Sequence, residues 1–190
     1  MPDAFLPLGM STPPEDVEAL MNLVRAARKP GAPHTFAVEV GSWAGRTALA
    51  MADAGAMVWC VDTWEGSVGD PVDDTERMVR QAGGPDTVFR VFCRNAGARL
   101  MRTVTPLRGP STLWASVWPY LADLVFVDGD HRYEAVRADI AAWLPKVRPG
   151  GILCGHDCGV FDGVNRAVGE AFPQGVEVHG RTVWVHRKPG

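Results

Sequence analysis

Two short polar segments of this sequence carry the groups best suited to chemistry. Asp128 and His131 follow the apolar run LADLVFV, and His156 and Asp157 follow the later apolar run GILCG. Two carboxylates that face one point repel each other unless a cation lies between them. Oxygen ligands suit Mg²⁺, Ca²⁺ or Mn²⁺. A fold that brings Asp128 and Asp157 together would therefore create a divalent-metal site.

Structural roles are open to the same residues. The pair Asp128-Gly129 is of a kind common in turns, Asp130 could cap a helix that begins near Arg132, and His156 could pair with a backbone carbonyl alone. The choice between these interpretations depends on whether the two polar segments meet in space.

A further candidate site follows the first apolar run, FAVEV, which leads directly into the turn GSWAG at 41–45. A dinucleotide-binding turn would read GxGxxG and would cradle a pyrophosphate at a helix N-terminus. This turn lacks that pattern, but Gly41 and Gly45 leave room for a ligand close to the backbone. Glu39, just before the turn, could face an ammonium group.

Asp62 ends the second apolar run, at a position where a carboxylate can accept both hydroxyls of a ribose. S-adenosylmethionine combines an amino acid part with a ribose and has no phosphate. The glycine turn and the two acids therefore favour this cofactor. The alternative is that Gly41 and Gly45 only permit a tight turn and that Asp62 only caps a loop.

The elements that position these residues alternate along the chain. Short apolar runs predict strands at 36–40, 57–61, 103–107, 124–127 and 151–155, with helices between them. Continuous apolar strands that alternate with helices indicate a parallel sheet covered on both faces. The last segments, 176–179 and 182–187, predict an antiparallel hairpin around Gly180. The fold class that follows is a doubly wound α/β domain.

Three local assignments are less direct. The spacing Thr12-x-x-Glu15 matches a capping box and predicts a helix over 13–28. The polar, glycine-bearing segment 65–74 predicts a loop over a site. The segment 87–93 fits a strand or a helix, and we favour a helix capped by Asp86.

Composition excludes several classes of protein. The chain has 190 residues, 46% of them hydrophobic, which suffices for the core of one domain over 1–190, with 1–35 as a helical extension. A net charge of −3 argues against a nucleic-acid partner. The sequence has no run of about 18 apolar residues, which is the pattern that would predict a membrane span. The four cysteines form no CxxC pair and favour reduced thiols in the cytoplasm.

Three segments together resemble a known family. They are VEVGSWAGRTA, CVDTWEG and FVDGDHRYEAVRADIAAWLPKVRPGGILCGHD. In this order they resemble the motifs of class I S-adenosylmethionine-dependent methyltransferases, especially the small bacterial group related to metal-dependent natural-product O-methyltransferases of the macrolide-sugar type. The resemblance covers about residues 36–187. It implies a Rossmann-like, mostly parallel seven-stranded sheet with a reversed edge strand.

The resemblance also implies roles in cofactor binding. It places Glu39 and Gly41 near the methionine end, Asp62 on the ribose, and the segment 109–111 near the adenine. Many relatives have an aspartate where Pro110 stands, and a proline has neither a side-chain acceptor nor an N–H group, but Ser111 could contribute a hydrogen bond to the adenine. The full set of expected cofactor-binding residues is Glu39, Gly41, Ser42, Trp43, Gly45, Asp62, Trp64, Ser111 and Asp128.

For catalysis, the resemblance implies that Asp128, His156 and Asp157 hold a divalent metal. Mg²⁺ is expected, although a histidine in place of the usual carboxylate favours a softer ion such as Mn²⁺ or Zn²⁺. The metal would lower the pKa of a substrate hydroxyl and His131 would remove its proton. Asp130 could orient the His131 ring or could itself bind the metal.

The predicted function is a metal-dependent O-methyltransferase acting on a small hydroxylated acceptor, such as a sugar unit. Alternatives are a metal-independent O- or N-methyltransferase and a non-catalytic nucleotide-binding module. Trp43 and Trp64 are expected to stack on the acceptor. The chain has little room for an added cap domain, so a second subunit of a homo-oligomer could complete the acceptor pocket.

Overall fold

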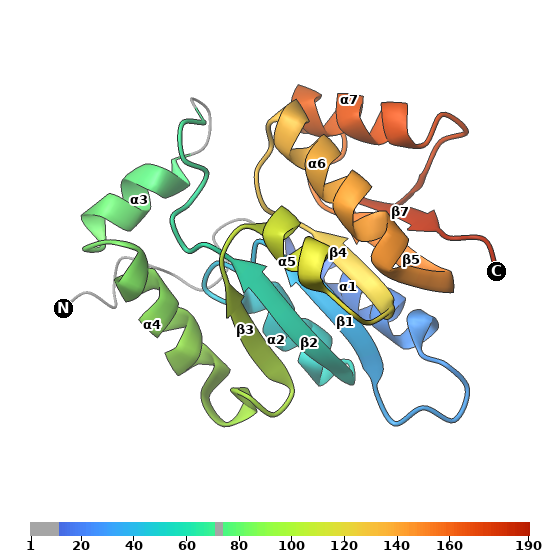
Figure 1. The fold of residues 1–190 in the computed structure, drawn as a ribbon, viewed down its shortest axis with the longest axis horizontal. Helices are drawn as coiled ribbons and strands as arrows, with labels where there is room; N and C mark the ends of the chain where they lie inside the picture. Colours follow the sequence, from blue (N-terminus) through green and yellow to red (C-terminus); the bar gives the residue numbers. More distant parts are fainter. Residues whose placement is uncertain (1–11, 71–73) are drawn as a thin grey trace.

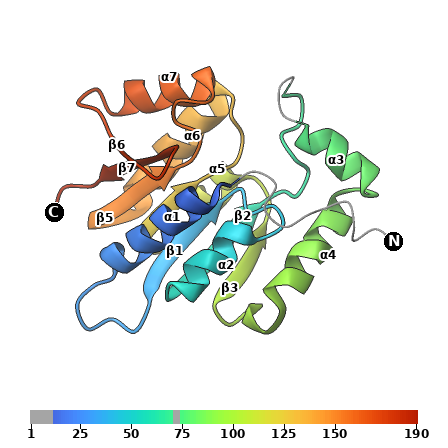
Figure 2. The same ribbon diagram turned by 180° about the vertical axis from the view of Figure 1, so that it is seen from behind.

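The computed structural model of this chain describes residues 12–70 and 74–190. A seven-stranded sheet forms the middle of three layers, and helices cover both of its faces (Figures 1 and 2). The strands are β1 (Thr35–Val40), β2 (Ala56–Asp62), β3 (Val104–Arg108), β4 (Ala122–Val127), β5 (Val147–Gly155), β6 (Glu177–His179) and β7 (Val183–Arg187). The helices are α1 (Pro14–Ala27), α2 (Arg46–Asp53), α3 (Thr75–Gln81), α4 (Pro85–Ala96), α5 (Ser111–Val117), α6 (Tyr133–Trp143) and α7 (Asp162–Ala171), with short 3₁₀ turns at Gly97–Arg99 and Leu144–Lys146.

The strand order is β3-β2-β1-β4-β5-β7-β6. β1 pairs in parallel with both β2 and β4, so the order of the strands reverses at β1 and the chain crosses the sheet there. In open α/β sheets, ligands bind at the carboxyl ends of the strands beside such a switch point. The predicted site residues lie at these ends.

The core lies on both faces of the sheet. All six residues of β4 are buried, as the apolar run at 124–127 predicts, and its one charged residue, Asp123, pairs with Arg148. One face packs against α1, α2 and α4, and the other face packs against α5, α6 and α7. The predicted doubly wound, Rossmann-like fold is confirmed.

The predicted hairpin at the sheet edge is also confirmed. β7 runs antiparallel to β5, and the short β6 pairs with β7 on its outer side. The reversed strand is therefore β7, and three residues of β6 cover its outer edge.

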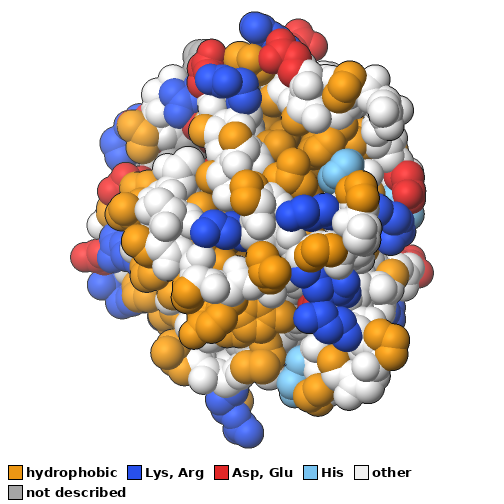
Figure 3. Space-filling model, turned by 45° about the vertical axis from the view of Figure 1, so that its right-hand side comes forward, with side chains coloured by type: hydrophobic (Ala, Val, Ile, Leu, Met, Phe, Trp, Pro, Cys, Tyr) orange, Lys and Arg blue, Asp and Glu red, His pale blue; other side chains and the backbone are white. Residues whose placement is uncertain are grey.

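The surface around α5 is mixed in character. This helix buries only Ala115, so Leu113 and Val117 are exposed. On the face drawn in Figure 3, hydrophobic side chains lie between basic and uncharged ones.

No helix within the described ranges has the length and apolar character needed to cross a membrane.

Three local expectations need correction or refinement. The capping box at Thr12 and Glu15 does not form, because Pro13 occupies the N-cap of α1 and no side chain caps it. The preference for a helix over 87–93 is confirmed by α4, but Gly84 is its N-cap, and Asp86 instead pairs with Arg108. Residues 71–73 of the expected loop, and 1–11 of the expected extension, lie outside the described residues.

Candidate active site

A cleft of about 620 Å³ opens at the carboxyl ends of β1, β2, β3 and β4. Its walls come from the turn after β1, the segment after β2, the start of α5, the loop after β4 and the inner face of α6. A cleft of this size, bordered by several charged groups, fits a small-molecule ligand. The cleft has one region near the ends of β1 to β3 and another near the ends of β4 and β5.

The glycine turn joins these two regions. Gly41 has φ +86°, and a Cβ built there would lie 2.1 Å from the backbone oxygen of Asp128. Gly45 has φ +92° and is the N-cap of α2. Positive φ and a close backbone approach both demand glycine. The turn can therefore lie directly against the loop that carries Asp128.

Asp62, at the end of β2, fixes the backbone at the edge of the cleft. Its carboxylate accepts a hydrogen bond from the backbone N–H of Trp43 at 2.8 Å and from that of Trp64 at 2.6 Å. Burial raises the pKa of Asp62, although these backbone donors oppose the shift. The backbone N–H groups of Ser42 and Thr63 also act on this carboxylate, so a ribose would share it with them, and Asp62 borders the cleft.

The side chain of Glu39 lies too far below the surface of the cleft to contact a ligand directly. Its side chain is fully buried below the turn, and burial raises its pKa to about 8, partly offset by the nearby hydroxyls of Ser42 and Thr47. Ser42 and Thr47 border the cleft, but Glu39 does not. A ligand ammonium group would therefore meet these hydroxyls before the carboxyl group of Glu39.

The two tryptophans of the predicted pocket wall differ. Trp43 borders the cleft. Trp64 is 0% exposed, its indole N–H donates to the Trp43 carbonyl at 2.8 Å, and its ring packs against Phe89 and Phe92. The expectation that Trp64 stacks on a ligand is therefore wrong, because its side chain belongs to the core.

At β3, Pro110 and Ser111 border the cleft together with Asp139 of α6. Ser111 Oγ accepts a hydrogen bond from the indole N–H of Trp143 at 2.7 Å, and its hydroxyl pairs with Asp139. The sequence interpretation missed Asp139. A signal was present, since Asp139 shares one helical face with Val136, which is buried.

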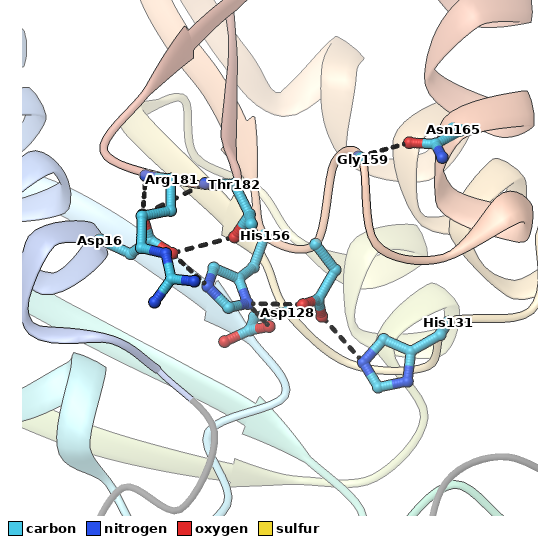
Figure 4. Close-up of polar contacts among 9 residues, drawn as sticks. Asp16, Asp128, His131, His156, Gly159, Asn165, Arg181 and Thr182 are labelled. Atoms are coloured by element: carbon cyan, nitrogen blue, oxygen red, sulfur yellow. Dashed lines mark hydrogen bonds and ion pairs between the residues drawn. The ribbon is translucent and has the colours of Figure 1, made fainter.

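Near β4 and β5, Asp128, His156 and Asp157 form a cluster. Figure 4 labels Asp128 and His156 of this cluster. One ligand atom from each lies within 4.8 Å of the other two. His156 Nδ1 is 3.5 Å from Asp128 Oδ1 and 3.1 Å from Asp157 Oδ1. The three residues predicted to hold a metal are thus together, although 29 positions separate the two aspartates.

The electrostatics of this cluster are strongly coupled. Burial raises the pKa of Asp128 to about 6, with His156 opposing the shift and Asp157 adding to it. Burial would also raise the pKa of Asp157, but hydrogen bonds from His131 and His156 bring it below its usual range. Burial would lower the pKa of His156, and the surrounding carboxylates raise it to about 9. Without a metal, an imidazolium therefore lies between the two aspartates.

Asp16 of α1 completes this cluster, and the sequence interpretation missed it. Its side chain is fully buried, and Oδ2 lies 3.0 Å from His156 Nε2 (Figure 4). Asp16 also accepts hydrogen bonds from the backbone N–H groups of Arg181 and Thr182, and from the Thr182 hydroxyl. This carboxylate therefore fixes the His156 ring from the side away from Asp128.

His131 lies at the edge of the same cluster. Its Nε2 is 3.0 Å from Asp157 Oδ2, and its ring stacks on Phe161 with centroids 4.1 Å apart. Gly163 makes this packing possible, because a Cβ there would lie 2.3 Å from the His131 carbonyl oxygen. The β5–α7 segment thus orients the ring of His131 through Asp157 and Phe161.

Asp130 takes neither of the two catalytic roles suggested by the sequence, and it contacts Arg132, the N-cap of α6, instead. It accepts hydrogen bonds from the backbone N–H and the guanidinium of Arg132. Burial would raise the pKa of Asp130, but Arg132 brings it below its usual value. Asp157, not Asp130, orients His131, and Asp130 lies outside the metal-ligand cluster.

The cluster has a donor set that fits a divalent cation. Two ligands of one ion at about 2.1–2.5 Å lie at most about 4–5 Å apart, which agrees with the spacing of these atoms. His156 would bind through Nδ1 if Nε2 carried its proton toward Asp16. Such a carboxylate–histidine pair behind a metal ligand is common, because it fixes the tautomer.

Comparison with known proteins bears directly on the cofactor. The family model described as "Methyltransferase domain" matches residues 38–158. The uncharacterized protein y4gI of Sinorhizobium fredii (strain NBRC 101917 / NGR234) is 30% identical over 116 residues. That match covers 58% of this chain but only 11% of y4gI, so the chain spans a small part of this relative.

Solved structures share the fold at lower identity. The O-methyltransferase NovP has a TM-score of 0.74 and 20% identity, over 99% of this chain and 88% of NovP. CalS11, a TDP-rhamnose 3'-O-methyltransferase, has a TM-score of 0.62 and 16% identity, over 90% of this chain and 78% of CalS11. Cofactor-bound Rv0187 from MTB has a TM-score of 0.67 and 15% identity, over 100% of this chain and 87% of that one. With the family match, the fold and the cleft, the chain belongs to the class I S-adenosylmethionine-dependent methyltransferases.

Proposed function

We propose that this protein is a divalent-metal-dependent O-methyltransferase that acts on a hydroxyl group of a small acceptor. One observation carries the proposal: Asp128 and Asp157 of the Asp128–His156–Asp157 cluster border the same cleft as the glycine turn of the cofactor region. The backbone of Gly41 touches that of Asp128, so a methyl donor on the turn and an acceptor at the cluster would be neighbours.

S-adenosylmethionine supplies an electrophilic methyl group on a sulfonium centre. The glycine turn and Asp62 would orient it, since they border the cleft from β1 and β2. A divalent cation held by Asp128, His156 and Asp157 would supply the Lewis-acid chemistry that lowers the pKa of an acceptor hydroxyl.

His131 would take the acceptor proton at Nδ1, because Nε2 carries its own proton toward Asp157 Oδ2 at 3.0 Å. A carboxylate at that distance stabilises the imidazolium that forms. A histidine suits this step because its ordinary pKa is close to neutral. Phe161 limits rotation of the ring by stacking on it, so the nitrogen keeps its direction.

The acceptor class is argued from the cleft and from similar proteins. Trp43 borders the cleft and is only partly buried against the core, and an aromatic residue at this position suits a sugar-like or planar acceptor. CalS11, a structural neighbour, is described as acting on TDP-rhamnose. We therefore propose a sugar hydroxyl as the first acceptor class to test.

A second candidate function keeps the cofactor and needs no metal. It is favoured by the raised pKa of His156, because an imidazolium between Asp128 and Asp157 already supplies a positive charge. In that case, proximity to the sulfonium would drive methyl transfer to oxygen or nitrogen.

A methyl-transfer assay separates the two functions. Isotope-labelled S-adenosylmethionine is offered with a panel of sugars, nucleotide sugars and amines, with excess chelator and after return of Mg²⁺, Mn²⁺ or Zn²⁺. The proposed function predicts that chelator abolishes methylation of a hydroxylated acceptor and that one ion restores it. Full activity in chelator would exclude the metal mechanism.

Two variants are matched for this assay. Asp128→Ala removes a proposed ligand and should lower turnover at least about 100-fold, while affinity for S-adenosylhomocysteine stays within a few-fold. Asp130→Asn changes an aspartate in the same loop that lies outside the cluster, so it should keep its bound metal.

A further inference from the structure

The β3 end of the cleft must recognise a purine if the cofactor lies as proposed. An adenine offers flat apolar faces, ring-nitrogen acceptors and one exocyclic amino donor, so the protein needs an acceptor for that donor. Pro110 stands in the loop after β3 and brings neither a side-chain acceptor nor an N–H group. The acceptor must therefore come from elsewhere.

Ser111 is already committed to the protein. Its Oγ accepts the indole N–H of Trp143 at 2.7 Å, and its hydroxyl pairs with the Asp139 carboxyl group. A hydroxyl has a single proton, so this proton is used within the chain. Ser111 thus positions Asp139 rather than recognising the base itself.

Asp139 has the placement that the base requires. It lies on α6, borders the cleft, and is only 8% exposed. Ala135 and Ala138 of the same helix also border the cleft, and their short side chains leave room for a planar ring. Pro110 adds apolar surface from the α5 side.

The burial of the Asp139 carboxyl group is unfavourable for the stability of the fold, which indicates that this group is kept to bind a ligand. Burial raises its pKa to about 6, with Ser111 opposing the shift. A carboxylate has about four acceptor positions, and a buried one with few donors is unfavourable. Buried acids in clefts with a raised pKa are often functional.

We propose that Asp139 is the adenine-recognising residue and that its carboxylate accepts a hydrogen bond from the 6-amino group. Asp139 does this from α6, in a chain whose loop after β3 has a proline. The inference rests on the use of S-adenosylmethionine and is independent of the metal, because no metal ligand takes part.

The test compares two nucleosides by titration calorimetry, without turnover. S-adenosylhomocysteine has the 6-amino donor, whereas S-inosylhomocysteine has an oxygen acceptor there. Wild-type protein should bind the adenine compound at least about tenfold more tightly. Asp139→Asn offers an amide that can donate to the oxygen, so the preference should fall to near one or reverse.

Two further variants complete the test. Glu134→Gln changes an exposed acid in the first turn of the same helix, and its preference should match that of wild type. Asp139→Ala should weaken binding of the adenine compound about tenfold and leave that of the inosine compound nearly unchanged. Retention of the full preference in Asp139→Asn, or an equal loss for both compounds, would overturn the proposal. Absence of binding to wild type would contradict cofactor use itself, and this proposal with it.

Discussion

The β1–β2 side of the cleft is shaped mainly by backbone, whereas the β4–β5 side is shaped by charged side chains. At β1, glycines with positive φ let the turn approach, and Asp62 is tied by backbone N–H groups. At β4 and β5, two histidines and three aspartates depend on one another. The first side should therefore respond to changes in shape, and the second to changes in charge.

The largest expected effect on the charged side is at His131. His131→Gln retains a hydrogen-bond donor for Asp157 but cannot accept a proton at neutral pH. If His131 is the base, turnover should fall about 100-fold, with metal affinity nearly unchanged. The measurement is the pH–rate profile of the variant beside wild type. Near-normal turnover with an unchanged profile would reduce His131 to a residue that positions Asp157.

The matching change on the backbone side is Gly41→Ala. The new Cβ would collide with the Asp128 backbone oxygen at 2.1 Å, so unfolding free energy should fall by about 3 kcal/mol. Gly159→Ala is the control, because Gly159 has φ +84° but no neighbouring atom within 4 Å of its Cβ position. That variant should lose only about 1 kcal/mol. Equal losses in denaturant unfolding would contradict the close contact between the two sides.

The unfolding free energy of the protein should depend on pH through the ionisation of Asp139. Its folded pKa, about 6, exceeds the usual 3.8, so the folded state keeps its proton more tightly and loses stability as pH rises from about 4 to 6. Asp139→Asn removes that penalty. The variant should be more stable than wild type by about 3 kcal/mol at pH 8 and equal to it near pH 3.5. Thermal or denaturant unfolding across this range measures the difference, and equal stability at pH 8 would contradict it.

The smallest effect is expected at Asp16, which touches the cluster only through His156. In Asp16→Asn, Oδ1 is needed by the backbone donors at Arg181 and Thr182, so the amide NH₂ would face His156 Nε2. This favours the tautomer with its proton on Nδ1 and removes the lone pair that a metal needs. Mn²⁺ affinity should fall about tenfold or more, with S-adenosylhomocysteine affinity unchanged. Unaltered Mn²⁺ affinity would exclude this positioning role.

The sequence predicted features that depend on local pattern. The central strands follow from apolar runs, most clearly β4, whose six residues are all buried, and the order of the runs in the chain predicted the α/β fold. Asp128 and Asp157 were predicted to meet because parallel strands end at one edge of the sheet. Pairing of β4 with β5 brings these two residues together.

The sequence did not reveal contacts that depend on side-chain direction or on distant segments. Asp16 reaches His156 across 140 positions, through the packing of α1 against the sheet. Trp64 follows an acid at a strand end, as a ligand-stacking residue could, but its ring turns into the core. α3 was not predicted because only Val79 of its seven residues is buried, which leaves little helical pattern.

The central claim is that Asp128, His156 and Asp157 form a divalent-metal site at the cofactor cleft. It is tested most directly by isothermal titration calorimetry, in which Mn²⁺ is added to metal-free protein at neutral pH. We expect one site in wild type and in Asp130→Asn, and loss of that site in Asp128→Asn and Asp157→Asn. Absence of a site in wild type, or the same affinity in all four proteins, would contradict the account.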